Sequence, residues 1–202
     1  MRIPTLICAL AIAAPGALPG QAGKWTGTLA AGYGQGVGDA FGGKGAVSAH
    51  VAAFRTLAPG AGFGLELGYS RFNSLTSSIP DLYGPGSLQR EDFRRSLWTA
   101  TASLRLRGGG GAWRPFAGVG LGAYLVRVHD QIVTQDATGT PIPGLQFDDS
   151  SSEVKPGMSL LAGLERARVF GRAGLGVQAR WDGVLSGTLA NVLSVGVVVT
   201  LD

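Results

Sequence analysis

The chain has 202 residues, which suits one domain, and 45% of them are hydrophobic, which is too many for a disordered chain. Charged residues make up only 15%, and the formal net charge of +4 is too small to indicate a nucleic-acid-binding protein. Glycine is unusually common at 34 residues, and no run of about 18 or more apolar residues follows the N-terminal segment. The composition therefore favours strands and turns over a transmembrane helix.

The N-terminus has the pattern of a secretory signal peptide. Arg2 supplies the positive charge, residues 3–14 form an apolar stretch, and small residues follow. Cleavage after Ala22 makes 1–22 the expected signal peptide; a membrane-anchoring helix is the alternative, which the prolines and glycines of this segment disfavour. Because Cys8 lies inside the signal, the mature chain is expected to lack cysteine, which excludes a disulfide and a thiolate metal site.

From Lys24 onward the dominant signal is alternation with a period of two, in which one parity is apolar and the other is small or polar. Successive side chains of a strand point to opposite faces, so this pattern predicts strands. Eight segments show it: 25–34, 46–57, 62–72, 95–107, 114–128, 157–167, 171–185 and 191–201.

The connections alternate in length. Turn-like links follow the second, fourth and sixth segments, at 58–61, 108–111 and 168–171. Longer links follow the odd segments, at 35–45, 73–94 and 129–156, with a short one at 186–190. Short periplasmic turns and long external loops are typical of bacterial outer-membrane barrels. The predicted fold is all-β, an eight-stranded antiparallel transmembrane up-and-down β-barrel that occupies 23–202.

The composition of the two strand faces indicates that the apolar face meets lipid. The other face is rich in Gly, Ser and Thr, and the sequence has few lysines. Aromatic residues lie toward the strand ends on the apolar face, as in the girdles of membrane barrels: Trp25, Tyr33, Tyr69, Trp98 and Trp181. A closed barrel also pairs every backbone group within hydrocarbon. A soluble exported lipocalin-like barrel that binds an apolar ligand is an alternative.

Two segments resemble strands of the small OmpA/OmpX-like outer-membrane β-barrel superfamily. One is Arg114–Tyr124, with a Pro-aromatic pair and alternating glycines, and the other is Gln178–Trp181, with an Arg-aromatic ending. The resemblance implies an outer-membrane protein with a structural, surface-interaction or limited small-solute passage role. The chain departs from that family at its end, where Leu201-Asp202 replaces the usual C-terminal aromatic residue.

Charged residues on the inward parity predict a polar network in the lumen, because buried charges need partners. Its expected members are Glu66, Arg105, Glu165, Gln178 and Arg180. Counting from the nearest short turns places Glu66 and Arg105 at similar depth, so these two are expected to face each other. The network would act as a gate on a narrow water path or, as we favour, as a structural plug.

Arginines gather at both expected membrane boundaries. Arg90, Arg94 and Arg95 lie at the expected outer end of the fourth segment, where lipopolysaccharide phosphates or ordinary boundary charge would account for them. A second set is expected to anchor the periplasmic turns to phospholipid headgroups: Arg107, Arg114, Arg166, Arg168 and Arg172.

The sequence provides no catalytic, cofactor or metal signature, so we expect a protein that is not an enzyme. Ser48 and His50 share one strand without a family motif, and a lipid-modifying outer-membrane barrel enzyme is the alternative. Carboxylates in 129–156 could bind calcium, but a solvated loop is favoured. The expected partners are outer-membrane lipid and lipopolysaccharide, with a possible external partner at loops 35–45, 73–94 and 129–156, and the barrel is expected to be a monomer without nucleic acid.

Overall fold

The computed structural model describes residues 23–37, 44–109, 111–185 and 191–201. The expected signal peptide, most of the first long loop and the short link at 186–190 lie outside the described residues. In the portion of the chain that the structure describes, no helix is long and apolar enough to cross a membrane.

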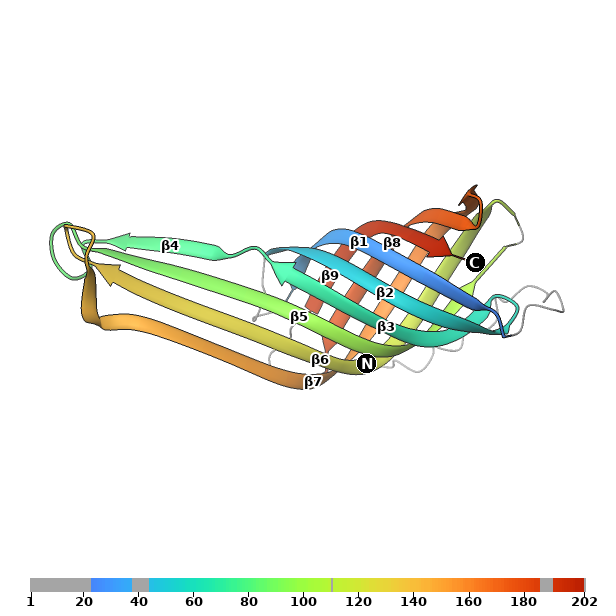
Figure 1. Ribbon diagram of the computed structural model, residues 1–202, viewed down its shortest axis with the longest axis horizontal. Helices are drawn as coiled ribbons and strands as arrows, with labels where there is room; N and C mark the ends of the chain where they lie inside the picture. The colour runs from blue at the N-terminus through green and yellow to red at the C-terminus, as the bar shows by residue number, and fades with distance from the viewer. Residues whose placement is uncertain (1–22, 38–43, 110, 186–190, 202) are drawn as a thin grey trace, which may run out of the picture.

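The described chain forms nine antiparallel strands, and eight of them close into a barrel (Figure 1). The strands are β1 (Trp25–Val37), β2 (Gly45–Ala58), β3 (Ala61–Phe72), β4 (Leu75–Pro80), β5 (Leu88–Arg107), β6 (Trp113–Gln135), β7 (Pro141–Phe170), β8 (Ala173–Val184) and β9 (Asn191–Leu201). β1 pairs with β9, and β3 pairs with β5, so the ring runs β1-β2-β3-β5-β6-β7-β8-β9. The predicted eight-stranded barrel is confirmed, with β4 as an additional strand outside the ring.

The barrel wall is apolar outside and polar inside. Leu65 on β3 and Val195 on β9 are 69% and 63% exposed, whereas Glu66 and Arg180 are only 4% and 2% exposed. This polarity is the reverse of that of a soluble barrel and suits a hydrocarbon surrounding. Expected girdle residues such as Trp25 and Trp98 are exposed on the same outer face.

Two clusters of apolar side chains pack inside the lumen. One buried cluster lies near the end where the longest strands leave the barrel: Ala46, Phe72, Leu97, Tyr124, Val184 and Val192. A second cluster lies deeper and toward the other end: Ala30, Phe116, Leu161 and Val198. The buried charged groups occupy the space between and beside these clusters.

The prediction of long loops at 73–94 and 129–156 is wrong, because these segments are largely strand. β5, β6 and β7 contain 20, 23 and 30 residues and continue past the barrel, with β4 paired to β5 (Figure 1). We call this extension, residues 75–95 and 128–151, the arm. Since β5 leaves β3 at Ser96, the eight residues before it extend about 26 Å at about 3.3 Å each.

Two turns with capping side chains close the tip of the arm. The Asp136 carboxylate accepts hydrogen bonds from the backbone amides of Thr138 and Thr140, at 2.8 and 3.0 Å, and from the Thr138 hydroxyl at 2.6 Å. In the other turn the amide of Gly86 donates to Asp81 Oδ1 at 2.6 Å. Asp side chains that bind the backbone just after them stabilise turns of this kind, so both hairpins of the arm have a fixed end.

Candidate functional site

Arg180 on β8 is the centre of a buried ion network inside the barrel. Its guanidinium donates to both carboxylate oxygens of Asp182, with Nε–Oδ2 2.7 Å and Nη2–Oδ1 2.9 Å, and its Nη1 binds Glu66 on β3. Tyr124 on β6 donates its hydroxyl to Asp182 at 3.2 Å. His50 on β2 places Nδ1 3.8 Å from Glu66 Oε1. Side chains from four strands thus meet around one arginine, which ties the walls together across the lumen.

Glu165 on β7 is the centre of a second buried network. Its carboxylate lies 3.0 Å from Arg107 Nε and 3.9 Å from Arg105 Nη2, and it accepts a hydrogen bond from the Thr200 hydroxyl at 2.9 Å. The Arg105 guanidinium also lies 4.0 Å from the ring centroid of Phe116, close enough for a cation–π contact. This network therefore combines ion pairing with aromatic packing on the short-turn side of the first one.

The structure places all five residues of the expected network inside the barrel, with Glu66 and Arg180 at one centre and Arg105 and Glu165 at the other. Glu66 lies opposite Thr101 and Arg105 lies opposite Gly62, so the two are not at the same depth as expected, although both line the same small hollow. Residue counts from two different turns ignore the stagger between tilted strands that barrel closure imposes. Gln178 lines a small hollow together with Glu66, Arg105 and Arg180.

Sequence reasoning missed several members of these networks. Asp182 and Tyr124 lie on the inward parity of their strands, and they were not assigned to the network. Arg107 was expected at the phospholipid headgroups, but it is only 19% exposed and contacts Glu165, so that expectation is wrong. The alternation itself would have found it, because Arg107 shares its parity with Arg105.

The lumen leaves little space for solvent at the networks. The hollow beside Glu66 and Arg180 has a volume of about 10 Å³, which is close to the minimum for one water molecule. Among the described residues, no group of three or more His, Cys, Asp or Glu side chains could hold a metal ion. The networks therefore have the geometry of packed, paired charges.

The outer arginines are distributed differently from the expected cluster at a strand end. β5 begins at Leu88, so Arg90, Arg94 and Arg95 all lie within it. Arg90 and Arg94 are exposed, and Arg94 binds the Asp92 carboxylate through Nη2 at 2.7 Å, whereas Arg95 has the opposite parity and is half-buried. The three do not form one patch, because side chains of opposite parity lie on opposite faces.

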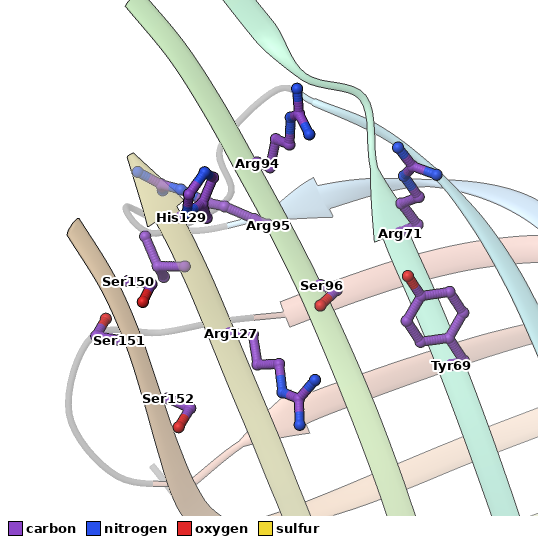
Figure 2. Close-up of a pocket in the computed structure, with 11 residues that line it drawn as sticks. Tyr69, Arg71, Arg94, Arg95, Ser96, Arg127, His129, Ser150, Ser151 and Ser152 are labelled. Carbon is purple, nitrogen blue, oxygen red and sulfur yellow. The ribbon is translucent and has the colours of Figure 1, made fainter. Parts of the chain in front are cut away.

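A different set of basic residues does gather on the outer face, at the boundary between barrel and arm. A hollow of about 480 Å³ lies there, lined by residues that include Arg71, Arg94, Arg127 and His129 (Figure 2). Four adjacent strands, β3, β5, β6 and β7, supply its wall. Sequence reasoning missed Arg71 and Arg127, because only the strand register brings them beside Arg94.

Closed antiparallel strands, an apolar outer wall and a charged, filled lumen define a small outer-membrane β-barrel. The structure is similar to that of the neisserial surface protein A, with 15% identity, a TM-score of 0.54, and coverage of 88% of this chain and 95% of that chain. Lower TM-scores of 0.47 and 0.44 relate it to Ail of Yersinia pestis (12% identity) and to the N-terminal β-barrel domain of Pseudomonas aeruginosa OprF (15% identity), each covering 89% of this chain and 99% of the other. No protein-family model and no curated protein matches the sequence.

Proposed function

We propose that the protein is a closed, non-enzymatic outer-membrane anchor that displays the arm outside the cell for contact with a partner. The observation that carries the proposal is the difference between the two parts of β5, β6 and β7. Within the barrel these strands surround buried ion pairs. Beyond the barrel they continue, with β4, as an open sheet (Figure 1).

The filled lumen argues against solute passage. Arg180 binds Asp182 on its own strand and Glu66 across the lumen on β3, and Glu165 on β7 contacts Arg107 on β5. Arg180 and Glu165 are both fully buried. An eight-stranded barrel is just wide enough for its own side chains, so a path for solutes would require these pairs to separate. Separating them exposes unpaired charges in a low-dielectric interior, which is costly. Structural plugging therefore accounts for the networks better than gating does.

The free edge of β7 supports a role in surface contact. Among the described residues, β8 pairs with β7 only from Gly157 onward, and residues 141–156 have one sheet neighbour, β6. An edge strand presents backbone N–H and C=O groups that can pair with an added strand. The acidic side chains Asp148, Asp149 and Glu153 along this edge are exposed and would favour a partner segment that carries positive charge.

Cysteine labelling tests the display of the arm, since the only cysteine is Cys8. We expect Thr138→Cys, at the arm tip, to react with a membrane-impermeant maleimide on intact cells. Arg172→Cys, in the turn between β7 and β8, is the matched control and should react only after the cells are opened. Labelling of Arg172→Cys on intact cells would contradict the proposed orientation.

The intact mass of the same protein tests our proposal that residues 1–22 are a cleaved export signal.

Two further measurements separate an anchor from a pore and from a purely structural barrel. In planar bilayers the purified protein should give no single-channel steps, and pore-sized steps would overturn the closed lumen. In a trimmed chain, one Asn-Gly turn joins Leu75 to Phe93 and another joins Asp130 to Asp149, which removes most of the arm. Each turn connects two residues that already face each other on paired strands, so the remaining strand register is kept. The trimmed chain should still fold and show a heat-dependent gel shift, whereas failure to fold would assign the arm a structural role.

A further inference from the structure

The outward side chains of β3, β5, β6 and β7 change from apolar to basic in one step at the arm end of the barrel. Tyr69 and Trp98 lie opposite each other with ring centroids 4.5 Å apart, and they continue the apolar wall. The next outward row toward the arm is Arg71, Ser96, Arg127 and Ser152, which are register partners across the four strands. A further row contains Arg94, His129 and Ser150.

We give one name, the basic row, to the four basic residues of these two register rows: Arg71 and Arg127 in the first, and Arg94 and His129 in the second. In the view of Figure 2, Ser96 lies between Arg71 and Arg94 on one side and Arg127 on the other. Arg71 and Arg127 are exposed and stand two strands apart, which is about 10 Å at about 4.8 Å per strand. Arginine side chains are long enough to reach one group, or two neighbouring groups, from that separation.

We propose that the basic row binds the phosphate groups of a lipid headgroup in the outer leaflet. The guanidinium fork suits bidentate hydrogen bonds to phosphate oxygens, and neighbouring serine hydroxyls can add further donors. Two acidic groups contact the row: Asp92, which binds Arg94, and Asp148, whose Oδ1 lies 3.6 Å from His129 Nδ1. Arg71 and Arg127 therefore carry the site, and Arg94 assists.

The position of the row favours a lipid over a soluble anion. Tyr69 and Trp98 lie directly next to it, and Leu67, one outward position further into the barrel, is 59% exposed. Aromatic residues of this kind mark the level of lipid headgroups in membrane barrels. A ligand with acyl chains beside the apolar wall and phosphates at the basic row satisfies both surfaces at once.

The opposite rim supplies a matched control. Arg55 on β2 and Arg166 on β7 also point outward next to aromatic residues, since Arg55 pairs with Trp25 and Arg166 pairs with Trp113. Three strands, β3, β5 and β6, separate these two arginines in the ring, whereas only β5 separates Arg71 from Arg127. They carry the same charge as Arg71 and Arg127 but do not form a row.

The experiment is native mass spectrometry of the full chain in detergent, titrated with diphosphoryl lipid A and with a dephosphorylated form that has the same acyl chains. We expect the phosphorylated lipid to bind about tenfold more tightly or better, because only this lipid can accept charge-assisted hydrogen bonds from the two arginines. Arg71→Ala/Arg127→Ala should abolish this preference, and Arg71→Lys/Arg127→Lys should retain part of it. Arg55→Ala/Arg166→Ala should leave it intact.

Three results would overturn the proposal. The first is equal binding of the two lipids by the unaltered protein. The second is loss of the preference in the Arg55/Arg166 control, which would mean that general positive charge is responsible. The third is full competition by millimolar inorganic phosphate, which would indicate a site for soluble anions. A heat-dependent gel shift for every variant establishes that each one is folded before it is titrated.

Discussion

The barrel and the arm consist of the same strands but satisfy their polar groups in opposite ways. In the barrel, alternate side chains face hydrocarbon or a filled lumen, and charged groups such as Arg180 and Glu165 are almost completely buried. In the arm, acidic side chains such as Asp148 and Asp149 face solvent. The charged groups of the barrel are therefore satisfied by enclosed partners, whereas those of the arm are satisfied by solvent and by turn caps.

The largest effect is expected from removing the centre of the first lumenal network. Arg180→Ala leaves Glu66 and Asp182 buried without their cation, and breaking a buried pair in this way costs about 3–5 kcal/mol. Urea unfolding followed by the heat-dependent gel shift measures this loss. The triple change Arg180→Met/Glu66→Gln/Asp182→Asn, which removes all three charges, should recover much of it. Arg55→Ala, at the exposed rim, should change the free energy of unfolding by less than about 0.5 kcal/mol.

The second network should be somewhat less sensitive. Glu165→Gln keeps the shape of the side chain but removes the negative charge that faces Arg105 and Arg107, with an expected loss of about 1.5–3 kcal/mol. The matched change in the arm is Glu91→Gln, where the carboxylate accepts hydrogen bonds from Ser77 at 3.1 Å and Gln89 at 2.8 Å. Equal losses of unfolding free energy in the two variants would mean that a carboxylate buried against arginines in the lumen contributes no more to stability than one in the arm.

The sequence was sufficient to predict the barrel, because alternation marks any strand with an apolar side and a polar side. It was not sufficient for the arm, where residues such as Thr76, Ser77 and Ser78 are polar on both sides and the period of two disappears. The lumenal charges were predictable one by one from parity, as for Glu66 and Arg180. Their partners depend on the stagger between strands, which sets Glu66 and Arg105 at different depths and which no single strand encodes.

A glycine packed closely against a neighbouring strand and a glycine in a turn provide a smaller and more local comparison. A Cβ added at Gly122 on β6 would meet the backbone carbonyl oxygen of Ala100 on β5, whereas one added at Gly111, in a short turn, would meet nothing within 4 Å. We expect Gly122→Ala to lose about 1–3 kcal/mol through overpacking, and Gly111→Ala to have almost no effect on urea unfolding. A neutral Gly122→Ala would show that β5 and β6 can move apart within the barrel.

The smallest effect is expected at the arm tip and depends on pH. The hydroxyl of Thr138, together with backbone amides of Thr138 and Thr140, lowers the pKa of Asp136 from its ordinary value of 3.8. A lowered pKa in the folded state means that the cap is complete above the unfolded value and is lost as pH falls through the folded one. The amide proton shifts of Thr138 and Thr140 should therefore be constant at neutral pH and change only below about pH 4. Asp136→Asn should shift both signals at all pH values and leave barrel unfolding unchanged, because the cap stabilises only the turn. A change in barrel unfolding in this variant would show instead that the arm and the barrel unfold as one unit.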